Sequence, residues 1–331
     1  MESQADAGTL WQNEGPRFLT GIHRPVYQFL NAEIITVPVI GDKPELNLKS
    51  VVYATDFSIC SQHAGLYSKL LARYFSATLF VAHAFTLSQS AMEVEVDHRL
   101  VSQQRKDLQF LLTRKASLLG NNSHEVIPAL IEGDPTTAIP ALAEDHAPSL
   151  IVLGTHGGTR ISRGVIGSVA EHILRSTRWP SLTVGPQVPS PPAAAFPFER
   201  ILYATDFTTA AAHAAAFAVS FAQTFGAEID VLNVIQAEAV EHPDRFSDLS
   251  ERFYKSLDKV VPRQASEFCD PRTFVEIGKA HEKILDHIRD RSIDLLVLGI
   301  RKTSHLGLEM RTSGAFQLIV DAQCPVLTVT G

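Results

Sequence analysis

The sequence predicts an α/β protein made of two tandem doubly wound units, each a five-stranded parallel sheet flanked by helices. Three observations predict this fold. Short strings of residues recur in the same order in the two halves of the 331-residue chain. Within each half, short runs rich in β-branched residues alternate with longer helical patterns, which is typical of right-handed crossovers and a parallel sheet. Several of the runs are apolar throughout, as in parallel strands covered on both faces.

The duplication is visible at the start and at the end of each half. Residues 51–57 (VVYATDF) return 150 residues later as residues 201–207 (ILYATDF). Residues 180–184 (PSLTV) return 145 residues later as residues 325–329 (PVLTV). Two strings that recur in the same order at similar separations indicate a repeated unit.

The boundary between the units is predicted at a segment rich in proline and alanine, because proline at high density blocks helices and central strands. The chain is accordingly divided into an N-terminal extension (1–47), a first unit (48–185), a linker (186–198) and a second unit (199–331). The extension is too short for a core of its own. Residues 32–40 are predicted to form one strand, and the aromatic residues nearby indicate that the extension docks on a unit.

The elements of the first unit follow from its hydrophobic pattern. Strands are predicted at residues 50–54, 78–84, 125–131, 150–154 and 181–184. Helices are predicted at residues 61–75, 92–119, 136–145 and 168–176. In the second unit, strands are predicted at residues 201–204, 228–234, 273–276, 295–299 and 326–329. In sheets of this kind ligands bind beyond the carboxyl ends of the strands, so functional residues are expected just after a strand.

Composition and charge exclude several classes of protein. The formal net charge is −7, and no run of Lys and Arg could follow a nucleic-acid backbone or an anionic membrane. The three cysteines lie far apart without a C-x-x-C pair, so neither a disulfide framework nor a zinc site is expected. The N-terminus has no signal-peptide pattern and no apolar run approaches a membrane span. We expect a cytoplasmic protein with no nucleic-acid or membrane partner and no resident metal.

A glycine pattern follows the fourth strand of the first unit. It reads Gly154-x2-Gly157-x9-Gly167-Ser168, and a helix is predicted to begin at Ser168. Glycine lets the backbone approach a ligand closely, and a helix N-terminus attracts anions through its free N–H groups. The pattern therefore predicts a phosphate site, to which the Ser168 hydroxyl could add a hydrogen bond.

Three further side chains in the same stretch are candidate phosphate contacts, namely His156, Arg160 and Arg163. A structural alternative stays open, because Ser168-x-x-Glu171 also has the form of a helix capping box. Asp56 and Asp206, which follow the first strand of each unit, have two interpretations as well. Each could shape the start of the next helix, and Asp56 could in addition bind the adenosine part of a nucleotide.

Residues 53–58 (YATDFS), residues 81–84 (VAHA) and the glycine pattern together resemble the universal stress protein family in its tandem form. The resemblance extends from about residue 48 to the end. It implies an adenine-nucleotide-binding fold with ATP as ligand, Mg²⁺ as a candidate accompanying ion, and homodimer-like packing of the two units within one chain. Further homodimerisation, an unidentified protein partner and a role in stress survival are also implied. By matching position, the nucleotide contacts would be Ala54, Thr55, Asp56, Ala84, Gly154, Gly157, Gly167, Ser168 and Val169.

Two departures from the family pattern affect the prediction. Family members often carry valine where Ala84 stands, so the wall around the base is expected to be looser. In the second unit Gly299 and Ser313 match the pattern, whereas Lys302 and Thr312 replace two of its glycines. We expect the second site to be degenerate and one ATP to bind per chain.

Three functions are compatible with the sequence. The first is an ATP-binding regulatory protein, and we assign it no catalytic residue because no nucleophile or P-loop motif is present. The second is a slow ATP hydrolase or nucleotide-processing enzyme of the same fold. The third is an interaction scaffold that has lost its nucleotide.

Overall fold

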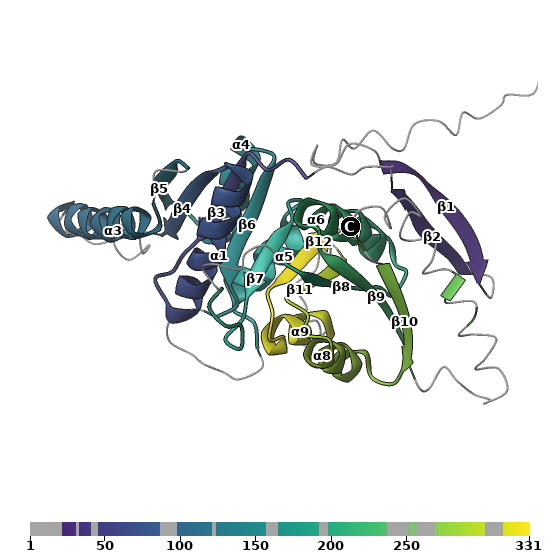
Figure 1. Ribbon diagram of the computed structural model, residues 1–331. Helices are drawn as coiled ribbons and strands as arrows, with labels where there is room; N and C mark the ends of the chain where they lie inside the picture. Colours follow the sequence, from purple (N-terminus) through teal and green to yellow (C-terminus); the bar gives the residue numbers. More distant parts are fainter. Residues whose placement is uncertain are drawn as a thin grey trace, which may run out of the picture.

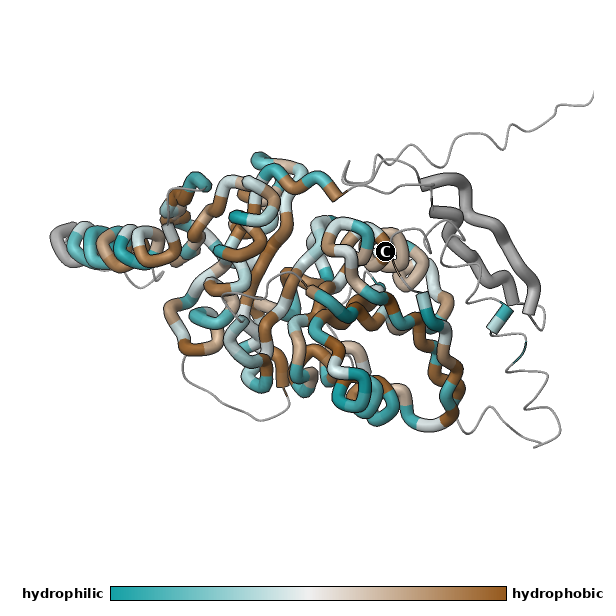
Figure 2. The backbone as a smooth tube through the Cα atoms, viewed as in Figure 1, coloured by the Kyte–Doolittle hydropathy of each residue, from teal (hydrophilic) through white to brown (hydrophobic). Residues whose placement is uncertain are grey.

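The computed structural model describes residues 22–30, 33–40, 46–86, 98–120, 124–156, 165–191, 198–236, 251, 254–255, 269, 271–301 and 314–331, with backbone only for 22–30, 33–40 and 98–100. Figure 1 shows a large twisted sheet flanked by helices, with a separate two-stranded hairpin to one side. In Figure 2 the hydrophobic segments gather in the strands, and the hydrophilic ones lie mostly on the helices.

The first unit is a five-stranded parallel sheet in the order β5-β4-β3-β6-β7. Its strands are β3 (Ser50–Ala54), β4 (Thr78–Phe85), β5 (Val126–Glu132), β6 (Ser149–Gly154) and β7 (Ser181–Val184). Its described helices are α1 (Ile59–Phe75), α3 (His98–Leu119), α4 (Pro135–Asp145) and α5 (Ser168–Ser176). The strand order reverses between β3 and β6, which confirms the predicted doubly wound fold.

The second unit repeats this arrangement in the order β10-β9-β8-β11-β12. Its strands are β8 (Arg200–Ala204), β9 (Glu228–Ile235), β10 (Pro271–Ile277), β11 (Leu295–Ile300) and β12 (Val326–Thr330). Its described helices longer than one turn are α6 (Thr209–Phe225), α8 (Ala280–Asp290) and α9 (Gly314–Asp321). The duplication read from the sequence is therefore a duplication of fold.

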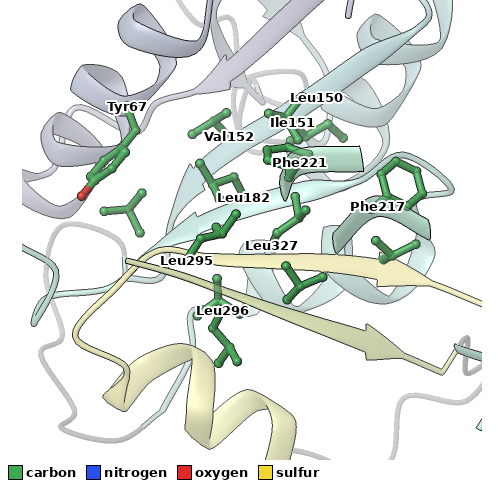
Figure 3. Packing of buried hydrophobic residues seen from close by; sticks show 14 of the residues in the cluster. Tyr67, Leu150, Ile151, Val152, Leu182, Phe217, Phe221, Leu295, Leu296 and Leu327 are labelled. Carbon is green, nitrogen blue, oxygen red and sulfur yellow. The ribbon is translucent and has the colours of Figure 1, made fainter. Parts of the chain in front are cut away.

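The two units share one ten-stranded sheet, because β7 and β12 pair in antiparallel fashion. Leu182 and Leu327, which hold the same position in the two repeats, face each other at the centre of this pairing. Figure 3 shows both side chains in the buried cluster at the junction. The expected packing of the two units against each other is thus observed as a continuous sheet.

Two hydroxyl groups add a matched pair of hydrogen bonds at this junction. Thr183 Oγ1 donates to the carbonyl of Val326 at 3.0 Å, and Thr328 Oγ1 donates to the carbonyl of Ser181 at 3.1 Å. Thr183 and Thr328 are equivalent in the repeat, as are Ser181 and Val326. The junction therefore has the local two-fold symmetry of an isologous dimer interface.

The N-terminal extension forms an antiparallel hairpin of β1 (Ile22–Leu30) and β2 (Glu33–Ile40). The strand predicted at residues 32–40 corresponds to β2, whereas β1 was not predicted. β2 lies against α6, so the extension docks on the second unit as expected (Figure 1).

The side chains on the outer face of α6 fit its contact with β2. Ala212 and Ala216 on α6 are 6% and 1% exposed, whereas their equivalents on α1, Gln62 and Leu66, are exposed. The side chains on the outer face of α6 are thus small and buried, whereas those at the equivalent positions of α1 are larger and exposed to water. Leu46 and Leu48, which follow the hairpin, belong to the common core.

Candidate functional site

A pocket of about 240 Å³ opens at the carboxyl ends of β3, β4 and β6, where the strand order of the first unit reverses. This is the place at which open α/β sheets bind ligands. The predicted site residues that line it are Ala54, Thr55, Asp56, Ala84, Gly154, His156, Gly167, Ser168 and Val169. Three other predicted residues, Gly157, Arg160 and Arg163, lie outside the described residues.

Alanines from two neighbouring strands form one wall of the pocket. Ala54 of β3 is in register with Ala82 of β4, and Ala84 follows two residues later on the same face of β4. Ile139 and Pro135 of α4 also line the pocket. Ala82 was not among the predicted residues, although the period of two along a strand places it beside Ala84. The wall is small and apolar, which suits a flat base.

The equivalent positions in the second unit carry larger side chains. Ala82 is replaced by Leu232, Ala84 by Val234 and Thr155 by Ile300. Leu232 is fully buried and Ile300 is 4% exposed. Lys302, Thr312 and Ser313, on which the predicted degeneracy of this site rests, lie outside the described residues. Larger apolar side chains thus occupy the second unit at positions where alanine and threonine line the pocket of the first.

The turn after β3 gives Asp56 a structural role. Asp56 Oδ1 accepts a hydrogen bond from the N–H of Ser58 at 3.0 Å, and Ser58 Oγ caps α1 by accepting from the N–H of Ser61. Asp206 accepts in the same way from Thr208. The aspartate thus shapes the turn in both units, while the capping residue is the one two positions later. Asp56 is exposed at the pocket, so its other oxygen remains accessible to a ligand.

The beginning of α5 faces the pocket, and no side chain in the described part of the chain caps it. Ser168 is the first helical residue, and the N-cap is Gly167, whose backbone is extended and for which no side chain described in the structure provides a capping bond. Glu171 instead pairs with Arg175 one turn later, at 3.2 Å. The capping-box interpretation of Ser168 is therefore wrong. The N–H groups of this first turn, which have no partner within the helix, can donate hydrogen bonds to an anionic ligand.

Gly154 is required by the packing of the fold itself. A Cβ atom at this position would lie 3.0 Å from the backbone of Cys60 and Ser61 in the first turns of α1. At Gly299 a Cβ atom would lie 2.3 Å from the backbone of Ala210 and Ala211 on α6. The close approach of strand and helix therefore explains why the second unit retains this glycine.

Two histidines line the pocket and are held by the surrounding chain. The ring Nδ1 of His156 lies 2.9 Å from Thr155 Oγ1, and the carbonyl of His156 accepts from Ser58 Oγ. His83 Nδ1 lies 2.8 Å from the carbonyl of Thr55, so it must act as the donor there. These bonds fix the ends of β3, β4 and β6 relative to one another.

The negative charge of Asp56 acts on its neighbours. The pKa of the Cys60 thiol is raised by burial and, in addition, by Asp56. Burial lowers the pKa of Lys115, whose Nζ lies 5.9 Å from the centre of the Phe57 ring, and the charge of Asp56 partly opposes that shift. In the described part of the chain, no cluster of three or more His, Cys, Asp or Glu side chains could hold a metal ion.

Fold and pocket together define a tandem α/β protein with a pocket at the switch point of its first sheet. A sequence model of the Universal stress protein family matches residues 47–185 and again residues 197–330. The chain therefore belongs to the universal stress protein family and carries two copies of its domain. Among the helices that the structure describes, none has the length and apolar character required to cross a membrane.

Similar proteins include several from archaea. The universal stress protein MJ0531 of Methanocaldococcus jannaschii is 28% identical over 138 residues, which covers 41% of this chain and 81% of that protein. MJ0577 of the same organism is 25% identical over 157 residues, covering 41% and 94%. The crystal structure of a universal stress protein from Archaeoglobus fulgidus superposes with a TM-score of 0.63 at 20% identity, covering 85% of this chain and 98% of that one. This last similarity extends over both units and shows the shared fold.

Proposed function

We propose that this chain is a cytoplasmic regulatory protein of the stress response that binds ATP in the pocket of its first unit. One observation carries the proposal. The pocket at the switch point gathers the ends of β3, β4 and β6 and the start of α5, and these are the segments from which the sequence predicted nucleotide contacts.

The chemistry of the pocket matches the parts of an adenine nucleotide. The alanine wall of Ala54, Ala82 and Ala84 would receive the base, and the accessible oxygen of Asp56 would accept a hydrogen bond from the adenosine part. The N–H groups at the start of α5 would receive phosphate oxygens. Asp56 is the carboxylate among the described lining residues, so it is the side chain that would hold a Mg²⁺ ion bound together with the phosphates.

We propose binding without rapid turnover. The titratable groups that line the described part of the pocket are Asp56, His83 and His156, and each already makes a hydrogen bond within the protein. The bond within the turn engages one oxygen of Asp56, so the described lining offers a single carboxylate oxygen both to hold a metal ion and to activate water, and this favours binding over rapid turnover. ATP occupancy would then act by favouring one conformation or one partner surface.

Mass spectrometry of the nucleotide released from purified protein tests the proposal directly, and ATP is the expected species. Isothermal titration of the nucleotide-free full chain with ATP should give about one site per chain. The Gly157→Lys variant, which copies the residue of the second unit into the first, should lose most of this binding, whereas Lys302→Ala should retain it. Two equivalent sites, or full binding by Gly157→Lys, would contradict the assignment to the first unit.

A further inference from the structure

Helix α5 has two buried faces that serve different parts of the molecule. Ala170 and Ile173 on one face line the pocket. Glu171, Leu174 and Arg175 on the other face are buried although they do not line it. This nine-residue helix therefore separates the pocket of the first unit from the part of the molecule that packs on its other face.

The second unit lies behind this wall. The Arg175 guanidinium is centred 4.3 Å from the ring of Phe316 on α9. The carbonyl of Leu174 accepts a hydrogen bond from Thr330 Oγ1 of β12 at 3.1 Å. A cation over an aromatic ring is strongest where water is excluded, and Phe316 is only 2% exposed.

The contact differs from the symmetric junction of β7 and β12. Glu171 and Arg175 of α5 correspond in the repeat to Phe316 and Val320 of α9. The ion pair of Glu171 with Arg175 thus comes from the first unit, and the ring on which Arg175 rests comes from the second. The two side chains of this pair are each 10% exposed, so the guanidinium is held on one side by a carboxylate and on another by the ring.

We infer that Phe316 of the second unit is a positioning residue for the nucleotide site of the first, acting through Arg175 to hold α5 in place. The inference rests on the proposed function. If the first turn of α5 binds phosphate, its N–H groups must be held in register with the ends of β3 and β6. The same helix is fixed at its other end by the second unit. The helix is therefore already oriented before the ligand binds, and little conformational entropy is lost in orienting it on binding. This gives the second unit a role that does not require it to bind nucleotide.

The test is isothermal titration of the full chain with ATP, in the wild type and in Phe316→Leu. Leucine keeps the site apolar but removes the ring face, so ATP binding should weaken about fivefold or more. Phe221→Leu is the matched control, because Phe221 is an equally buried phenylalanine of the second unit on α6. It should bind ATP as the wild type does, even if its melting temperature falls as far as that of Phe316→Leu.

Variants of Arg175 provide a second test, whose expected pattern a general loss of stability would not reproduce. Glu171→Gln with Arg175→Met removes the ion pair without leaving a buried charge, and it should weaken ATP binding as Phe316→Leu does. Combining all three substitutions should add little, because they break one contact. Arg175→Lys, made with Glu171 intact, keeps a cation at this position. It should therefore bind ATP more tightly than the variant that carries Glu171→Gln and Arg175→Met.

The outcomes separate this inference from the proposal beneath it. A wild-type chain that takes up no ATP overturns the proposed function and the inference with it. A wild-type chain that binds ATP, together with a Phe316→Leu variant that binds equally well, overturns the inference alone. Additive losses in the combined variant would likewise show that Phe316 does not act through Arg175.

Discussion

At the scale of single residues, the two units differ most clearly at positions that a ligand would touch. Gly154 and Gly299 are both retained, and the structure explains them by the tight contact between a strand end and a helix. Ala82 has no counterpart of its own size, since Leu232 stands at the same place in β9. The glycine that the fold requires thus occurs in both repeats, whereas the small alanine that leaves room for a ligand occurs only in the first.

The Ala82→Leu substitution should therefore close the pocket. Leucine at this position projects from the wall formed with Ala54 and Ala84, so ATP binding should weaken about tenfold or more, a loss of at least about 1.4 kcal/mol. The second unit already carries leucine there, so the strand itself accommodates the side chain. Titration with ATP measures the effect, and unchanged binding would mean that the base lies elsewhere.

The reverse substitution in the other repeat is the control. Leu232 is fully buried, so Leu232→Ala should cost about 2–5 kcal/mol of stability through the cavity that it leaves. It should leave the affinity and stoichiometry of ATP binding as they are in the wild type.

At the scale of elements, the second unit carries a buried ionic network between β9, β10 and α8. The Asp230 carboxylate lies 3.1 Å from His287 Nε2, 3.1 Å from Arg291 Nε and 3.2 Å from Arg272 Nε. Glu276 approaches the other ring nitrogen of His287 at 3.5 Å. The network joins the edge of the sheet to the helix that covers it.

The network makes the stability of the second unit depend on pH. Burial alone would raise the pKa of Asp230, but hydrogen bonds from His287 and Arg291 and the charges of Arg291 and Arg272 hold it below its ordinary value. A carboxyl with a lower pKa in the folded state stabilises the protein above its unfolded pKa of about 3.9, and loses that contribution as the pH falls through the folded pKa. Asp230→Asn should therefore cost about 3 kcal/mol at pH 7, and progressively less below about pH 4.

Urea denaturation of wild type and variant at a series of pH values measures this difference. Asp286→Asn, which changes a half-exposed carboxylate on α8, should stay within about 0.5 kcal/mol of the wild type throughout. A cost for Asp230→Asn that does not vary with pH would show that packing, and not charge, is what the variant loses.

The N-terminal hairpin is a second element with a testable role. Because β2 lies against α6, deleting residues 1–40 should expose the small apolar face that includes Ala212 and Ala216. The melting temperature should fall by roughly 1–3 °C, as a loss of roughly 1–2 kcal/mol would produce in a cooperative chain of this length. The deletion stops before Leu46 and Leu48, which belong to the core of the units.

Hydrogen exchange identifies the cause of that fall. Amides of α6 should exchange faster in the shortened chain, whereas those of the equivalent helix α1 should keep their wild-type rates. An unchanged melting temperature together with unchanged exchange would show that the hairpin contributes nothing to the second unit.

The sequence predicted those elements whose signals are local. The strands at residues 50–54 and 181–184 and the helix at 168–176 have the predicted bounds, because glycine, proline and apolar runs delimit them. Helix α1 begins two residues earlier than predicted, since Ser58 supplies its cap. The hairpin strand β1 was missed because its run contains Arg24 and Pro25 and lacks a clean alternation.

What could not be predicted depends on contacts between distant segments. Ser168 fits a capping box by sequence, but Glu171 is engaged by Arg175, which packs on Phe316 of the other unit. The period of two along a strand places Ala82 beside Ala84, but its position next to Ala54 depends on the register of β3 and β4. The partners of Asp230 come from two elements well separated from it in the sequence, so no local sequence pattern predicts the network.

At the scale of the whole molecule, the two repeats are one body. A single cluster of buried apolar residues extends from Leu46 to Val329, and the sheet passes from one unit into the other through β7 and β12. Leu182 and Leu327 are both fully buried at that junction. Neither unit can unfold without exposing apolar surface of the other, so strong coupling of their stabilities is expected.

Heating should therefore unfold both units in one transition, although one unit alone is proposed to bind ATP. A ligand that binds the native state at a hundred times its Kd adds about 2.7 kcal/mol to stability. With coupled units, saturating ATP should shift the whole transition upward, including any signal that reports on the second unit. Calorimetry with and without ATP measures this, with Ala82→Leu as the control whose transition should move about half as far or less at the same ATP concentration. Two transitions, of which ATP shifts only one, would show that the continuous sheet does not bind the repeats into a single cooperative structure.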